Sequence, residues 1–99
     1  MADHQVTVVA QIRAKDGMEE QVKQELMKLV GPTRSETGCI NYDLHQSTEN
    51  ESLFMFYENW ASKKDLDEHA RTPHMKAHLQ KARELFAEPP TITLWEMIR

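Results

Sequence analysis

The chain has 99 residues, of which 39% are hydrophobic and 28% charged, a composition that fits one globular domain with a modest core. Its net charge is −4 with scattered Lys and Arg, so a nucleic-acid partner, which normally needs a basic face, is not expected. No stretch approaches the roughly 18 apolar residues of a membrane span, and the N-terminus lacks the pattern of a signal peptide. The single cysteine, Cys39, excludes an internal disulfide. We therefore expect a cytoplasmic protein.

The first periodic segment, residues 6–14, alternates in the manner of a strand with one buried face. Asp16 and Glu19 match a D-x-x-E helix start, and Gly31-Pro32 is expected to end that helix. The predicted helix carries an apolar stripe at helical spacing, made of Met18, Val22, Leu26, Leu29 and Val30.

Gly38 precedes a second predicted strand, residues 39–46, in which one face holds Ile40, Tyr42 and Leu44. After a polar turn, a third strand follows over residues 52–61. One side of this strand carries Phe54, Phe56, Glu58 and Trp60. The other side carries Leu53, Met55, Tyr57 and Asn59, and we expect both faces to be covered.

Two helical pieces follow the third strand. Ser62 and Asp65 form a capping pair for a short helix that ends near Arg71. Thr72-Pro73 is the pattern of an N-cap followed by Pro at the first helical position, and it begins a second piece that extends to about Ala87. The buried stripe of that piece is expected to be Met75, Leu79, Ala82 and Phe86.

The last predicted strand, residues 91–98, completes the order β-α-β-β-α-β. This order predicts an α+β ferredoxin-like fold with an antiparallel sheet. Helices can cover only one face of such a sheet, and the other face still carries apolar side chains. An uncovered apolar face usually marks a partner, and the simplest partner is a second copy of the chain, which predicts a homodimer.

Several residues are candidates for chemistry. A carboxylate among aromatic residues, as Glu58 is, has a raised pKa and can act as acid or base, unless a Lys or Arg at the strand end pairs with it. Trp60 is either a pocket wall or a core residue. His74, at the border of the buried stripe, is a candidate for proton transfer, whereas His78 is expected to be structural.

The sequence gives little support for a metal site, a nucleotide-binding site or a serine-hydrolase site. His74 and His78 have the i, i+4 spacing of a helical metal pair, but no third ligand is evident from the sequence, so no metal is expected. No glycine-rich phosphate loop and no G-x-S-x-G motif is present. Cys39 has no neighbouring base in the sequence.

Three segments, residues 33–47, 53–62 and 66–76, resemble the antibiotic biosynthesis monooxygenase family, whose members include quinol monooxygenases. The resemblance lies in the spacings E-x-G-C-x-x-Y, F-Y-E-x-W and H-x-x-T-P-H, which occur here in that order. It implies a dimeric α+β barrel with a pocket in each subunit, between the sheet and the helices.

The resemblance also implies an activity, the oxygenation of a small quinol-like or phenolic aromatic by O₂ without a cofactor. On this reading His74, Glu58 and Tyr42 are catalytic, with His74 as proton acceptor, and the substrate is bound by Trp60, His69, Phe56 and Arg34. An isomerase of a small carbonyl compound, with Arg34 holding an anion, and a non-catalytic binding module remain alternatives. Haem degradation is not expected, because Ile12 stands where the haem-degrading branch has an asparagine.

Overall fold

The computed structural model describes residues 4–99, so the first three residues, on which part of the signal-peptide expectation rests, lie outside the described residues. The elements are β1 (Val6–Arg13), α1 (Glu19–Arg34), β2 (Cys39–Gln46), β3 (Leu53–Trp60), α2 (Lys63–Ala70), α3 (Pro73–Leu85) and β4 (Thr91–Trp95). All strand pairs are antiparallel, in the order β2-β3-β1-β4. The predicted α+β ferredoxin-like fold is confirmed.

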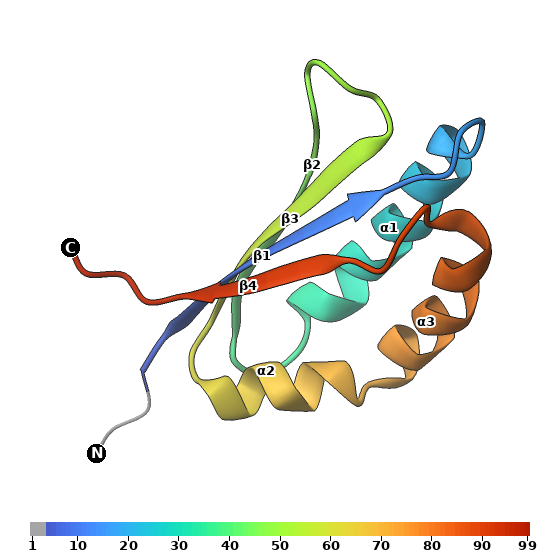
Figure 1. Ribbon diagram of the computed structural model, residues 1–99. Helices are drawn as coiled ribbons and strands as arrows, with labels where there is room; N and C mark the ends of the chain where they lie inside the picture. Colours follow the sequence, from blue (N-terminus) through green and yellow to red (C-terminus); the bar gives the residue numbers. More distant parts are fainter. Residues whose placement is uncertain (1–3) are drawn as a thin grey trace.

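The three helices lie on one side of the sheet (Figure 1). Alternation places Val8, Ala10 and Ile12 of β1 toward them, and all three are buried. From the helix side, the predicted stripe of α1 supplies Val22 and Leu26, which are fully buried, together with Leu29. The core is therefore a single layer between sheet and helices, and any site in it is bordered by both. No helix among residues 4–99 is long and apolar enough to cross a membrane.

The two ends of α1 differ from the prediction. Asp16 does not cap the helix, whose N-cap is Met18 without a side-chain hydrogen bond; instead the Glu19 carboxylate accepts the Gly17 N–H at 3.2 Å. At the other end the helix continues through Pro32 to Arg34. A proline so close to a helix end removes only one backbone donor, and the last turn tolerates that loss.

The start of β2 depends on a glycine and a bulge. Gly38 has φ +90°, and a Cβ there would lie 2.3 Å from Cγ of Asp65, so α2 packs where only glycine fits. The register then shifts between Cys39 and Asn41, which leaves Ile40 as an extra residue with 55% exposure. The prediction that Ile40 shares the buried face of Tyr42 is wrong for this reason.

The helices after β3 begin as predicted. The Ser62 hydroxyl accepts the Asp65 N–H at the start of α2, and Thr72 caps α3 with Pro73 in the first turn. The predicted stripe of α3 is wrong in one position, because Leu79 is 54% exposed. His78 and Ala82, four residues apart, face inward instead, and Leu79 lies about 100° around the helix from His78.

Leu26 of α1 is buried and Leu79 of α3 is half exposed, and this difference in burial gives a stability prediction. Leu26→Ala, which empties a fully buried position, should lower the free energy of unfolding by about 2–5 kcal/mol. Leu79→Ala should lower it by less than about 1 kcal/mol, since half of that side chain already meets solvent. Urea denaturation of both variants beside the wild type checks this. Equal losses would contradict the orientation of α3.

Candidate active site

A cavity of about 260 Å³ lies between the inner side of the sheet and α2 and α3. Its wall is mainly apolar and includes Phe56 of β3. The wall also holds five side chains that can hold or move a proton, namely Tyr42, Glu58, Asp67, His69 and His78. A largely apolar cavity with a few convergent polar groups is the usual form of a small-molecule site.

Tyr42 and Glu58 reach the cavity as a cross-strand pair. They lie directly opposite each other in β2 and β3, so their side chains point to the same face of the sheet. Phe56 stacks on Tyr42 with ring centroids 4.3 Å apart. Burial raises the pKa of Tyr42 above its usual range, and the nearby Glu58 charge acts in the same direction. The phenol therefore stays protonated and can donate a hydrogen bond.

Glu58 is a carboxylic acid in an apolar setting. Its residue is 4% exposed, and Trp60 Nε1–H donates to its Oε1 at 2.9 Å. Within residues 4–99 it has no Lys or Arg partner, so the salt bridge considered from the sequence is not formed. Burial raises the pKa of Glu58 to about 7, although the Trp60 hydrogen bond lowers it. Glu58 can therefore exchange a proton near neutral pH.

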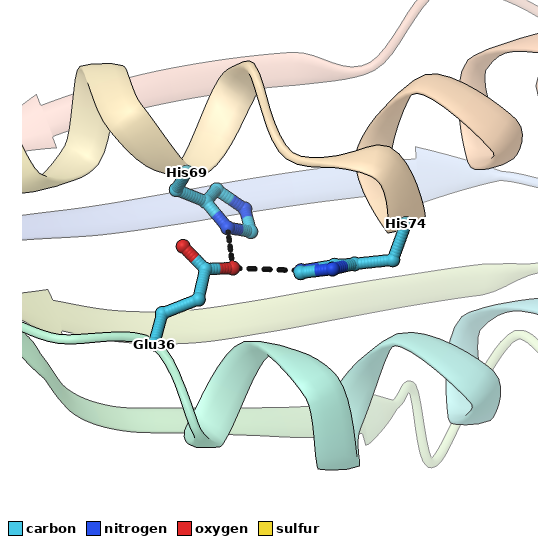
Figure 2. A group of neighbouring side chains, drawn as sticks. All are labelled: Glu36, His69 and His74. Atoms are coloured by element: carbon cyan, nitrogen blue, oxygen red, sulfur yellow. Dashed lines mark hydrogen bonds and ion pairs between the residues drawn. The ribbon is translucent and has the colours of Figure 1, made fainter.

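Glu36 joins two histidines from two helices. It lies in the loop between α1 and β2, while His69 is near the end of α2 and His74 is in the first turn of α3 (Figure 2). The same oxygen, Glu36 Oε2, lies 2.7 Å from His69 Nδ1 and 2.7 Å from His74 Nε2. Because a carboxylate only accepts, each of these two nitrogens carries a hydrogen.

The bond to Glu36 leaves the other nitrogen of His69 available. The ring packs against Trp60, with centroids 4.7 Å apart, and lines the cavity. Among residues 4–99, Thr33 Oγ1 is the only fully buried side-chain polar atom without a hydrogen-bond partner. His69 Nε2 forms no hydrogen bond within residues 4–99, and the side chains of both His69 and Tyr42 line the cavity. Burial lowers the pKa of His69, although Glu36 raises it, which favours a neutral ring.

A second histidine–carboxylate pair lies at another part of the wall. His78 Nδ1 is 3.3 Å from Glu25 Oε2 of α1, and both residues are buried. Burial lowers the pKa of His78 despite the opposing effect of Glu25. The cavity thus has two imidazoles, each oriented by a carboxylate behind it.

The sequence of this site matches a known family. The model described as "Antibiotic biosynthesis monooxygenase" matches residues 5–81, which include Tyr42, Glu58, His69 and His74. The chain belongs to this family.

Several named proteins are similar to this chain over most of its length. "Putative monooxygenase Rv0793" of Mycobacterium tuberculosis is 32% identical over 90% of this chain and 87% of its own length. Its solved structure has a TM-score of 0.90, at 27% identity and 96% coverage of both chains. "Probable quinol monooxygenase YgiN" of Escherichia coli K12 is 33% identical over 74% of this chain and 80% of its own. The chain spans 65% of a Synechocystis relative, "Uncharacterized protein sll1783", at 29% identity.

The site residues predicted from the sequence divide into two groups in the structure. Tyr42, Glu58, Phe56 and His69 line the cavity. His74, Trp60 and Arg34 do not line it. The His74 ring points to Glu36, and Trp60 lies behind Glu58 and His69. Arg34 pairs with Asp43 at 3.0 Å and borders a separate groove between α1 and β2.

Sequence reasoning missed part of the site. The pair of His74 and His78 does not form a unit, because each ring turns to a different carboxylate. Glu36 was visible in the E-x-G-C motif but received no role, and Glu25 received none either. The signal for Glu25 was its position three residues after Val22, on the buried stripe of α1, where a carboxylate needs a partner.

Glu58 gives a pH-dependent prediction. Its native pKa of about 7 lies above the unfolded value of 4.5, so the native state holds a proton that the unfolded chain releases. Wild-type stability should therefore fall as pH rises from about 4.5 to 7. Glu58→Gln removes this dependence but keeps an acceptor for Trp60. Between pH 5 and pH 8, the stability of the variant relative to wild type should rise by about 2–3 kcal/mol in urea denaturation. A constant difference would show that Glu58 has an ordinary pKa.

Proposed function

We propose that this protein is a cofactor-independent monooxygenase that acts with O₂ on a compact quinol-like or phenolic aromatic. The observation that carries the proposal is His69, held by Glu36 through Nδ1, on the wall of an apolar cavity that also holds Tyr42 and Glu58. The monooxygenase names of the family and of YgiN support the reaction type. A cavity of about 260 Å³ is below the usual range for larger ligands and favours one or two rings.

His69 is the proton acceptor in this proposal, in place of His74. A general base must present an unprotonated atom to the proton it removes. Glu36 keeps the hydrogen of His69 on Nδ1, which leaves the Nε2 lone pair for the substrate hydroxyl. His74 bonds the same Glu36 oxygen from the other side but does not line the cavity, so it is a positioning residue.

Tyr42 and Glu58 hold the substrate oxygen as it becomes negative. The Tyr42 phenol stays protonated, and Glu58 is partly protonated near neutral pH, so each can donate to a phenolate. Donors placed in a site of low polarity stabilise such an anion strongly. Phe56, which stacks on Tyr42, provides a flat apolar surface for the aromatic ring.

The chemistry after deprotonation needs little from the protein. The electron-rich anion transfers one electron to O₂, and the substrate radical and superoxide combine to form a peroxide on a ring carbon. Loss of water from the protonated peroxide breaks the O–O bond and the C–H bond of that ring carbon and leaves a carbonyl, so one oxygen atom enters the product and the other leaves as water. His69, protonated in the first step, returns its proton in the last.

An isomerase on the same site is the second candidate. Its support is the pair of imidazoles, His69 and His78, that line one cavity and are each bonded to a carboxylate. Two such groups suit removal of a proton from one carbon and delivery to its neighbour. Oxygen consumption separates the two candidates, since an isomerase consumes none.

The catalytic roles predict unequal effects of two histidine substitutions. With an oxygen electrode and a panel of one- and two-ring quinols, His69→Ala should lower kcat/KM by roughly 10²–10⁴-fold, the usual contribution of a general base. His74→Ala should lower it by less than about tenfold, since Glu36 still holds His69. A larger loss of kcat/KM in His74→Ala than in His69→Ala would show that His74 is the general base and His69 is not. Wild-type protein that consumes no O₂ with any quinol would contradict the oxygenase.

A homodimer formed through the uncovered side of the sheet completes the proposal. On that side Tyr57 and Trp95 are 40% and 59% exposed, Val9 and Met55 are half-buried, and no helix covers them. Light scattering at micromolar concentration should give twice the mass of one chain. Tyr57→Glu should give a monomer, because it buries a charge in the interface. Met27→Glu, on the exposed side of α1, is the matched control, and a monomeric wild type would refute the dimer.

A further inference from the structure

Three donor atoms of the Glu36 cluster converge on one point. Glu36 Oε2, His69 Nδ1 and His74 Nε2 all lie within 4.8 Å of one another, and the oxygen is 2.7 Å from each nitrogen. The three side chains come from three different segments and point toward a common centre (Figure 2). The two imidazole N–H groups contact the carboxylate oxygen through hydrogen bonds. A metal cation can take the place of these two hydrogens and bind all three donor atoms.

The donor set fits a particular class of ion. Two imidazoles with one carboxylate suit divalent first-row transition metals, whereas Mg²⁺ and Ca²⁺ prefer oxygen alone. Ions of this class bind imidazole nitrogen and carboxylate oxygen at about 2.0–2.2 Å, which puts neighbouring donors roughly 3 Å or more apart. The 2.7 Å contacts therefore need to widen by roughly 0.3–0.7 Å, depending on whether the ion is octahedral or tetrahedral.

We propose that Glu36, His69 and His74 form a binding site for one divalent first-row transition-metal ion, and that the bound ion ends proton acceptance by His69. The first half is independent of the proposed function, and the second half rests on it. A metal on Nδ1 displaces the hydrogen there, and a neutral imidazole then carries its hydrogen on Nε2. The nitrogen that faces the cavity changes from acceptor to donor, so the metal-loaded protein lacks its base.

The solvent exposure of the three ligands and the polar group beside them are consistent with a metal site. The His74 side chain is 21% exposed, which gives an ion a route from solvent, while His69 and Glu36 are more buried. Three protein ligands leave at least one position for water, and the Thr72 hydroxyl, 3.2 Å from His74 Nε2, is a polar neighbour for it.

Co²⁺ alone is the probe for the site. Protein stripped with a chelator is titrated with Co²⁺ while its visible d–d absorption is recorded, for wild type and three variants. Wild type should bind one ion per chain. His74→Ala and, as a second ligand variant, Glu36→Gln should bind at least about tenfold more weakly, as expected when a metal site loses a contributing group. His45→Asn, an exposed imidazole bonded to the Asp43 carbonyl, is the matched control and should bind as wild type does.

Two results would overturn the site: the lack of a saturable absorption band, or equal Co²⁺ affinity in wild type and both ligand variants. Zn²⁺ tests the second half without any turnover assay. In ¹⁵N–¹H spectra of histidine side chains, Nε2 of His69 should be unprotonated in the metal-free protein and protonated after Zn²⁺ saturates the site. An Nε2 that stays unprotonated with Zn²⁺ bound would refute the switch. A failure of quinol turnover would count against the proposed function alone.

Discussion

The site depends on one carboxylate oxygen. Glu36 Oε2 takes a hydrogen bond from His69 at the end of α2 and another from His74 at the start of α3. Both rings can reach it because the chain turns between the two helices at Thr72-Pro73, and because α1 continues past Pro32 and delivers Glu36 beside them. The same bond fixes the tautomer of His69, and so decides which of its nitrogens a ligand in the cavity meets.

Some buried polar groups in this part of the molecule lack the partners that polar groups in a structural core normally have. Within residues 4–99, Glu58 is buried without a cation, and Thr33 Oγ1 is buried without a hydrogen-bond partner. Each costs free energy, since a buried polar group has lost the water that solvated it. Perturbed acids and unpaired polar atoms concentrate at functional sites, where stability is given up for reactivity. The position of Glu58 on the wall of an apolar cavity is therefore evidence for function that does not depend on any relative.

Much of the sheet could be predicted from the sequence, because strand parity is a strict rule. Tyr42 and Glu58 had inward parity on strands joined by a short turn, and the register places them opposite each other. The rule failed at Ile40, where a bulge inserts one residue. The helix side was less predictable, because the rotation of α3 depends on packing. Leu79 and His78 differ by one position, and the burial of Glu25 gave His78 the partner that brings it inward.

The direction of a histidine ring could not be predicted for a related reason. His69 and His74 were both visible in the H-x-x-T-P-H motif, but their roles depend on Glu36, more than 30 residues earlier in the chain. No local pattern says which ring faces the cavity and which lies behind the carboxylate. The interaction is long-range, and the motif spacing E-x-G-C reports only that Gly38 is needed where β2 meets α2.

A crystal structure of the protein with a phenol that resists oxidation tests the central claim most directly. The account predicts the ring in the cavity against Phe56 and the phenol oxygen at hydrogen-bond distance, roughly 2.6–3.2 Å, from His69 Nε2, with Glu36 still on Nδ1. A phenol oxygen bonded to His74, or a ligand seated in the groove beside Arg34 with the cavity empty, would contradict it.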